Sequence, residues 1–157
     1  MVKKSCLFLD TIVNKIDTKG RVSIPADYRS ILDERQVELV LYRSFLHPCI
    51  EGCTADLLEQ MAGTIDRSFD TFSKEQDDLT ALIFADSKVF VPDSTGRISL
   101  TPKLLSHARL SDSAVFVGKG KTFQIWQPAL WEESLQKIRQ RAFQEPLTLS
   151  CKTEGVS

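Results

Sequence analysis

One eight-residue motif occurs twice in this chain of 157 residues. Residues 17–24 read Asp-Thr-Lys-Gly-Arg-Val-Ser-Ile, and residues 93–100 read Asp-Ser-Thr-Gly-Arg-Ile-Ser-Leu. The copies begin 76 residues apart (from 17 to 93), and each is followed by a proline, a short helical stretch and an apolar run with aromatic residues. A single copy is too short to bury much surface. The repeat therefore predicts that a small β-rich unit has been duplicated, with both copies sharing a core.

A turn is expected in the middle of each motif. Gly20 and Gly96 stand where a tight turn needs a positive φ, which glycine adopts without strain. Asp17 and Asp93 can accept backbone N–H groups across the turn. Each motif is therefore predicted to be a tight hairpin. Its flanking strands are expected at residues 12–16 and 21–24 in the first copy, and at 88–91 and 98–100 in the second.

The remaining segments predict a mixed fold. Apolar spacing indicates short helices after each proline and a longer helix at the end of each copy. Apolar runs between them are typical of strands, and the first of these is expected to be followed by a strand that ends at Ile50. The predicted helices are 26–33, 54–69, 74–84, 103–109 and 128–143, and the other predicted strands are 37–42, 114–117 and 123–126.

The charge of the chain does not favour a simple electrostatic nucleic-acid binder. The net charge is −1, whereas domains that bind nucleic acid are usually strongly basic. The objection fails if the cations gather on one face. Four of them lie around the first motif in the sequence, namely Lys15, Lys19, Arg21 and Arg29.

No apolar run approaches the length of about 20 residues that a membrane-spanning helix needs. The apolar part of residues 1–10 is too short for a secretion signal, and Asp10 interrupts it. We therefore expect a cytoplasmic protein without membrane partners.

The cysteines do not predict a disulfide framework, because they are few and irregularly spaced. They are Cys6, Cys49, Cys53 and Cys151. His47, Cys49 and Cys53 offer three metal ligands, while a structural zinc site needs four. Free thiols are the alternative, and we expect neither a metal nor a cofactor.

Enzyme motifs are weak in this sequence. Residues 118–121 (Gly-Lys-Gly-Lys) lack the spacing of a phosphate-binding loop. Ser106 with His107, and His47 with Cys49, could suggest a nucleophile and a base. No third, orienting group is apparent for either pair. We therefore expect no enzymatic activity.

The order of the motifs resembles the MraZ family, bacterial regulators of the SpoVT-AbrB superfamily. The resemblance rests on both Asp-x-x-Gly-Arg motifs, on Phe-Val-Gly at residues 116–118 and on Phe-Gln-Ile-Trp at 123–126. It runs from about residue 8 to residue 143. It implies an α+β fold, a duplicated SpoVT-AbrB-type swapped-hairpin β-barrel with flanking helices. The implied repeats are 11–58 and 87–130, with a helical linker at 59–86 and a C-terminal helix at 131–143.

The resemblance also implies a function. Family members are expected to form closed rings, commonly of eight, and to associate with the nucleoid. They bind repeated short sites in double-stranded DNA, in the promoter of the division and cell-wall gene cluster that contains their own gene. There they typically repress transcription.

The residues implied in DNA binding belong to the two motifs and the flank of the first. They are Lys15, Lys19, Gly20, Arg21, Gly96 and Arg97, with Asp17 and Asp93 as turn formers or orienting residues. Thr95 stands where the first copy has Lys19, so the copies are expected to bind unequally.

Several alternatives remain open at this stage. Arg21 and Arg97 could form salt bridges to Asp17 and Asp93 instead of contacting DNA. Lys15 and Arg29 could be part of a basic flank or ordinary solvated surface. A protein-interaction or assembly module is the alternative function, because an aromatic set could face a partner. That set is Trp126, Trp131 and Phe143.

Overall fold

The computed structural model describes residues 6–149, which form five helices and eight strands. The first half of the chain contains, in order, β1 (Thr11–Lys15), β2 (Arg21–Ser23), α1 (Ala26–Arg35), β3 (Leu39–Arg43), β4 (Ile50–Thr54) and α2 (Ala55–Ser68). Helix α3 (Lys74–Ile83) leads to the second half. That half contains β5 (Lys88–Phe90), β6 (Arg97–Ser99), α4 (Pro102–His107), β7 (Ser113–Gly118), β8 (Phe123–Trp126) and α5 (Pro128–Gln144). The combination of helices and antiparallel strands confirms the predicted α+β class.

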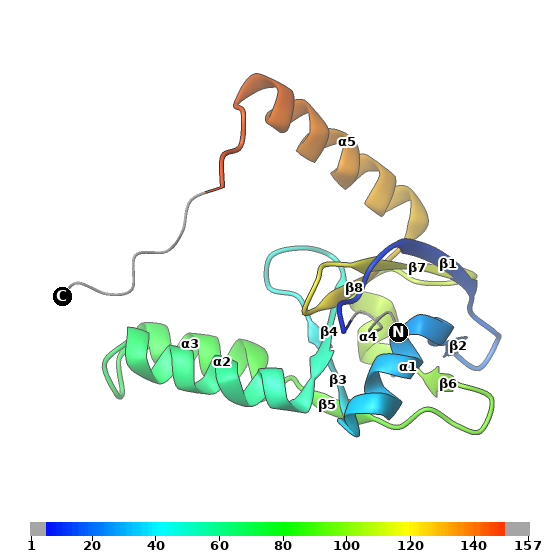
Figure 1. The fold of residues 1–157 in the computed structure, drawn as a ribbon, viewed down its shortest axis with the longest axis horizontal. Coiled ribbons are helices and arrows are strands. Elements are labelled where there is room, and N and C mark those ends of the chain that lie inside the picture. The colour runs from blue at the N-terminus through cyan, green and yellow to red at the C-terminus, as the bar shows by residue number, and fades with distance from the viewer. Residues whose placement is uncertain (1–5, 150–157) are drawn as a thin grey trace, which may run out of the picture.

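The strands form two sheets, each built from both halves of the chain (Figure 1). The larger sheet has the order β1–β7–β8–β4–β3–β5, and all its pairings are antiparallel. Strands β2 and β6 form a separate antiparallel ribbon. Strands β1–β4 have the same sequential places in the first half as β5–β8 in the second. The order of the larger sheet therefore reads the same from either edge, and each edge strand pairs with a strand of the other half.

The two motifs form turns, but not simple hairpins. The N–H of Gly20 donates to the Asp17 carbonyl at 3.0 Å, so the predicted turn is present. The strands beside it then separate, since β1 pairs with β7 and β2 pairs with β6. One isolated bridge, Ile16 to Val22, joins the two arms directly. The pattern of apolar residues predicts which face of a strand is buried, but it does not predict which strand pairs with it.

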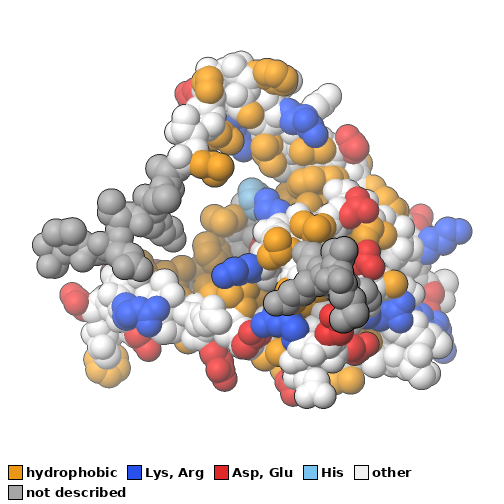
Figure 2. All heavy atoms as spheres, in the orientation of Figure 1, with side chains coloured by type: hydrophobic (Ala, Val, Ile, Leu, Met, Phe, Trp, Pro, Cys, Tyr) orange, Lys and Arg blue, Asp and Glu red, His pale blue; other side chains and the backbone are white. Residues whose placement is uncertain are grey.

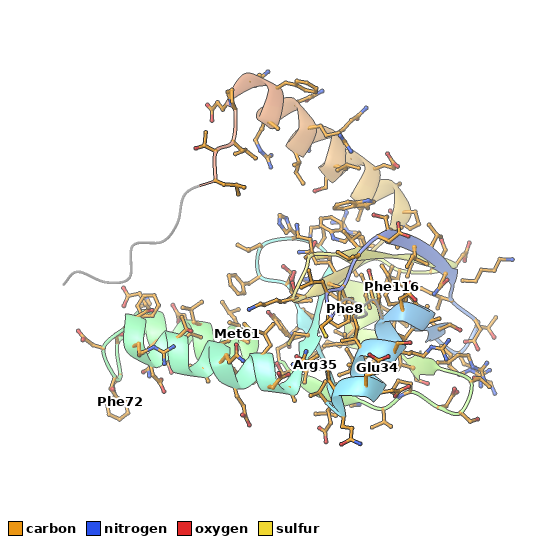
Figure 3. The ribbon with its side chains drawn as sticks, viewed as in Figure 1. Phe8, Glu34, Arg35, Met61, Phe72 and Phe116 are labelled. Atoms are coloured by element: carbon orange, nitrogen blue, oxygen red, sulfur yellow. The ribbon has the colours of Figure 1, made fainter. Side chains whose placement is uncertain are left out.

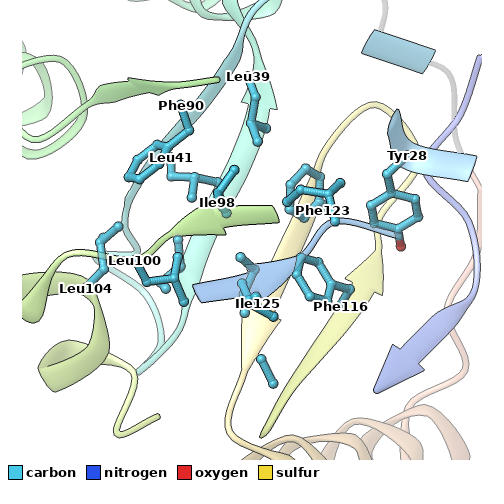
Figure 4. Close-up of a cluster of buried hydrophobic side chains, with 14 of the residues drawn as sticks. Tyr28, Leu39, Leu41, Phe90, Ile98, Leu100, Leu104, Phe116, Phe123 and Ile125 are labelled. Carbon is cyan, nitrogen blue, oxygen red and sulfur yellow. The ribbon is translucent and has the colours of Figure 1, made fainter. Parts of the chain in front are cut away.

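The main core lies between the sheets and helices α1 and α4 (Figure 4). Its centre holds four aromatic side chains. The ring of Phe123 lies 5.0 Å from that of Phe8 and 5.2 Å from that of Tyr28, measured between centroids. Phe116 lies 6.3 Å from Tyr28, edge to face. These rings come from the N-terminal segment, α1, β7 and β8, so this cluster joins the two halves.

One predicted strand was placed wrongly. The strand after β3 was expected to end at Ile50, whereas β4 begins there and runs to Thr54. The preceding residues form a loop because the Ser44 hydroxyl accepts the backbone N–H groups of Leu46 at 3.1 Å and His47 at 3.2 Å. Such a side chain offers the backbone an alternative to a strand ladder.

Helices cover the outer face of the larger sheet in a repeated pattern. Helices α2 and α3 pack on β3 and β4 through Val40, Cys53, Ile65 and Ile83, which are buried. Helix α5 packs on β7 and β8 through Trp126 and Trp131, whose rings lie 5.6 Å apart. Both tryptophans of the predicted aromatic set are thus buried in this layer, while Phe143 is 87% exposed.

The long helices extend beyond the sheets. Helices α2 and α3 form an arm whose tip carries Phe72, and α5 leaves in a different direction (Figure 3). Phe72 is 94% exposed. Within residues 6–149, no helix has both the length and the apolar character needed to cross a membrane.

Candidate nucleic-acid interface

The first candidate element is loop 1, residues 17–20, which is held by a single carboxylate. Oδ1 of Asp17 accepts the backbone N–H of Lys19 at 2.9 Å and that of Arg21 at 2.8 Å. Oδ2 of Asp17 accepts Nε–H of Arg21 at 2.6 Å. Asp17 therefore shapes the turn and orients the arginine at the same time. The salt bridge between Arg21 and Asp17, one of the alternatives that the sequence left open, is present.

Loop 2, residues 93–96, has the same plan with one difference. Oδ1 of Asp93 accepts the backbone N–H groups of Thr95 at 2.9 Å and Arg97 at 3.0 Å. The Thr95 hydroxyl donates to Asp93 at 2.7 Å and accepts Nε–H of Arg97 at 2.9 Å. Asp93 itself lies 3.5 Å from that nitrogen. Thr95 is thus inserted between the acid and the arginine, where loop 1 has a direct contact.

Both loop carboxylates are ionised at neutral pH. The backbone N–H of Arg21 is the main cause that lowers the pKa of Asp17. The backbone N–H of Arg97 and the Thr95 hydroxyl lower the pKa of Asp93 to about 2. Hydrogen bonds to a charged carboxylate favour the charged form. The shape of each loop is therefore maintained throughout the physiological pH range.

The motif glycines have the predicted backbone conformation. Gly20 has φ +79° and Gly96 has φ +81°. Their carbonyls also connect the loops to the ribbon, since Gly20 accepts the N–H of Leu100 and Gly96 accepts that of Ile24, both at 2.9 Å. Each loop is therefore attached to the strand end of the other half.

The ribbon places the two arginines on one surface. Val22 pairs with Ile98, and both are buried, with 1% and 3% exposure. Arg21 and Arg97 occupy the alternate positions and so point away from the core. They are diagonal neighbours, since Arg21 pairs with Ser99 and the next residue on that face of β6 is Arg97. About a third of each arginine side chain is exposed, 35% for Arg21 and 36% for Arg97.

The other predicted cations lie near this surface. Lys19 is exposed at the tip of loop 1, and Lys15 is exposed at the end of β1, which leads into that loop. Figure 2 shows lysine and arginine side chains, with acidic ones among them, at the right-hand end of the molecule, where the loops lie in Figure 1. Arg29 joins this group because it packs against loop 2. No local sequence signal indicates that contact.

In the described part of the chain, the residues considered for a metal site or a phosphate-binding loop are not arranged as such sites. Burial raises the pKa of Cys49 to about 12 and that of Cys53 to about 11, so both thiols stay protonated at neutral pH. Across residues 6–149, no group of three or more His, Cys, Asp or Glu residues could hold a metal ion. Cys151 lies outside the described residues.

The turn at 118–121 leads into strand β8 and not into a helix, so it lacks the helix N-terminus that phosphate-binding loops use. His107 Nε2 contacts the carbonyl of His47 at 3.2 Å.

Comparison with known proteins identifies relatives along most of the chain. The family model described as "MraZ protein, putative antitoxin-like" matches residues 83–150. A protein of Pelagibacter ubique named "Transcriptional regulator MraZ" is 43% identical over 137 residues, which cover 87% of this chain and 88% of that protein. Proteins with the same name from Gluconobacter oxydans and Rickettsia canadensis are 42% and 37% identical. They cover 87% and 91% of this chain, and 85% and 96% of their own lengths. The chain therefore belongs to the MraZ family, which is a family of transcriptional regulators and not of enzymes.

Proposed function

We propose that this protein regulates transcription by binding double-stranded DNA through loops 1 and 2. The observation that carries the proposal is the outward placement of Arg21 and Arg97 on one ribbon, each oriented by its own loop. Lys19 and Lys15 add positive charge beside loop 1. Gly20 and Gly96 shape the turns through their positive φ, and since both are buried, the proposed contacts to DNA are made by the side chains around them.

The geometry of the ribbon suits a DNA groove. The major groove admits a two-stranded β-ribbon, and an arginine in it can bind guanine through two hydrogen bonds. The same guanidinium can instead hold a phosphate. Nε of each arginine is engaged within its loop, at 2.6 Å for Arg21 and 2.9 Å for Arg97. This contact orients the guanidinium before DNA arrives, which reduces the entropy lost on binding.

The strand pairing supports the finer fold proposal. We propose a duplicated swapped-hairpin β-barrel of the SpoVT-AbrB type, with repeats at 11–58 and 87–130. The linker 59–86 and the C-terminal helix 131–143 flank these repeats. The palindromic order of the larger sheet and the pairing of β2 with β6 are what such a duplication requires.

A single protomer offers few cations, so we propose that several act together. A ring of identical protomers, of eight as the family resemblance implies, would direct many loops to one DNA duplex. Linking binding sites raises the overall affinity by about 10²- to 10⁴-fold when the spacing of the loops in the ring matches the spacing of the sites on the DNA. The proposed targets are repeated sites in the promoter of its own division and cell-wall gene cluster. We also propose that the protein represses transcription from this promoter. It would act in the cytoplasm, associated with the nucleoid.

A protein-interaction or assembly module is the second candidate function. The observation in its favour is the exposure of two large aromatic side chains, Phe72 at 94% in the turn between α2 and α3 and Phe143 at 87% on α5. Exposed apolar groups of this size mark contact surfaces when they gather into patches. Under this alternative, the loop arginines would have no effect on any binding event.

The test is retention of the protein's own upstream DNA by a double variant, Arg21→Ala with Arg97→Ala. We expect DNA affinity to fall about 100-fold, since each arginine contact contributes about 1–3 kcal/mol. The matched control is Arg67→Ala with Lys74→Ala, which removes two cations from the helical arm and leaves affinity unchanged. Equal affinities for the loop variant and the wild type would exclude these arginines from the site.

A further inference from the structure

The side chain of Arg29 lies across loop 2, although Arg29 belongs to the other half of the chain. Nε of Arg29 donates to the Ile24 carbonyl at 3.1 Å. A Cβ built on Gly96 would lie 2.4 Å from Nη1 and 2.7 Å from Cδ of Arg29. Helix α1 therefore holds a guanidinium against the glycine of loop 2.

Loop 1 has an apolar residue at the matching place. Leu105 on α4 follows Arg29 by the 76 residues that separate the motifs (from 29 to 105). Its Cδ1 would lie 3.2 Å from a Cβ built on Gly20. A leucine is therefore sufficient to cover the motif glycine. The positive charge at Arg29 requires a separate explanation.

Loop 2 lacks a cation that loop 1 carries. Lys19 is exposed in loop 1, whereas Thr95 holds the same position in loop 2 and binds Asp93. With Arg29 in place, loop 2 has two cations beside it, Arg97 and Arg29. Loop 1 has Lys19 and Arg21 at the matching places, and Lys15 at the end of β1.

The guanidinium of Arg29 has a hydrogen-bond partner, the Ile24 carbonyl, but no ion-pair partner in the described part of the chain. Between residues 6 and 149, no carboxylate forms an ion pair with Arg29. Asp33, Glu38 and Asp93 line the same surface cavity of about 350 Å³ as Arg29, and Asp93 is already engaged by its own loop. The Arg29 side chain is partly exposed. An external anion can therefore reach its guanidinium.

We infer that Arg29 binds DNA: its guanidinium contacts a backbone phosphate beside loop 2 and replaces the cation that is missing at Thr95. This inference rests on the function proposed above. It changes the expectation, made from Thr95 alone, that the two copies bind unequally. Arginine suits this role because its planar fork can donate two charged hydrogen bonds to one phosphate, even while Nε serves the Ile24 carbonyl.

The experiment removes the charge but keeps the cover over Gly96. Arg29→Leu copies the arrangement that Leu105 makes at loop 1. Binding to the upstream DNA is measured over a range of salt concentrations. We expect affinity to fall about fivefold to tenfold, and the slope of log affinity against log salt to decrease by about 0.9 for each phosphate contact removed. Adding Thr95→Lys to this variant supplies a lysine where loop 1 has Lys19, and should restore both values.

The outcomes separate this inference from the proposed function. Arg29→Leu could leave affinity and slope unchanged while the Arg21 and Arg97 double variant binds weakly. That result would overturn the role of Arg29 and leave the proposed function standing. A loss in Arg29→Leu that Thr95→Lys does not restore would also overturn it, because the loss would then be structural. If neither the loop variant nor Arg29→Leu changes binding, the proposed function itself fails.

Discussion

Replacing Gly52 with valine is expected to lower the free energy of unfolding by about 3 kcal/mol, without any change at the DNA-binding loops. Gly52 lies opposite Phe123 where β4 pairs with β8. A Cβ at position 52 would lie 2.4 Å from Cζ of the Phe123 ring and 2.5 Å from Cε2. The ring has no free space to move into, because Phe123 is fully buried and contacts Phe8 and Tyr28. Chemical denaturation measures the effect.

The control for this prediction is a variant that shortens the opposing side chain. Phe123→Leu alone should destabilise the protein, because it removes buried aromatic surface. Combined with Gly52→Val, it should cost at least about 1 kcal/mol less than the sum of the two single changes, since the shorter side chain makes room for the valine. Strict additivity of the two changes would contradict the close packing of ring and strand.

This contact also has a consequence for the whole molecule. Strands β4 and β8 belong to different halves of the chain, and their pairing lies at the centre of the larger sheet. The aromatic cluster around Phe123 is shared by both halves in the same way. The halves therefore cannot unfold independently. A single cooperative transition should be observed for the wild type and for both variants.

The elements of this fold could be predicted from the sequence better than their pairing could. Strand β8 was predicted at 123–126 and is observed there, and helix α5 was predicted at 128–143 and ends one residue later. Helix α5 has 17 residues, which is long enough for its apolar spacing to be distinctive. Strands β2 and β6 have three residues each, and such short segments contain no information about their partners. The repeat predicted equivalent halves, and only the structure shows that β2 pairs with its equivalent β6 and β4 with its equivalent β8.

In the candidate site, too, the local contacts could be predicted from the sequence and the contacts between the two halves could not. The contacts of Asp17 with Arg21 and of Asp93 with Arg97 span four residues, so local chemistry was sufficient to predict them. The sequence offered ion pairing and DNA contact as alternatives. The structure shows the ion pairs, with about a third of each arginine still exposed. Arg29 reaches loop 2 only because α1 packs against the other half, which local reasoning cannot reveal.

Replacing Asp86 with asparagine is expected to lower the free energy of unfolding by about 2 kcal/mol at neutral pH. Asp86 is held by Arg43, whose Nη2 lies 2.7 Å from Oδ1 and whose backbone N–H donates to Oδ2 at 2.7 Å. Lys103 on α4 lies 3.1 Å from the same carboxylate. The side chain of Asp86 is only 8% exposed. These contacts connect β3, α4 and the segment that leads into β5 and loop 2. Lys103→Ala is the matched control, and it should cost less because Lys103 is largely exposed.

The effect of Asp86 should depend on pH in a defined direction. The Arg43 guanidinium is the main cause that holds the pKa of Asp86 well below its ordinary value. A carboxyl with a lowered pKa in the folded state stabilises the protein above the unfolded-state pKa, and this contribution is lost as the pH falls below it. The difference between wild type and Asp86→Asn should therefore be constant near neutral pH. It should narrow below about pH 4, by at most about 1.4 kcal/mol for each pH unit. Denaturation curves between neutral and acidic pH measure it, and a difference that widens on acidification would show that Asp86 does not stabilise the fold as an ionised group.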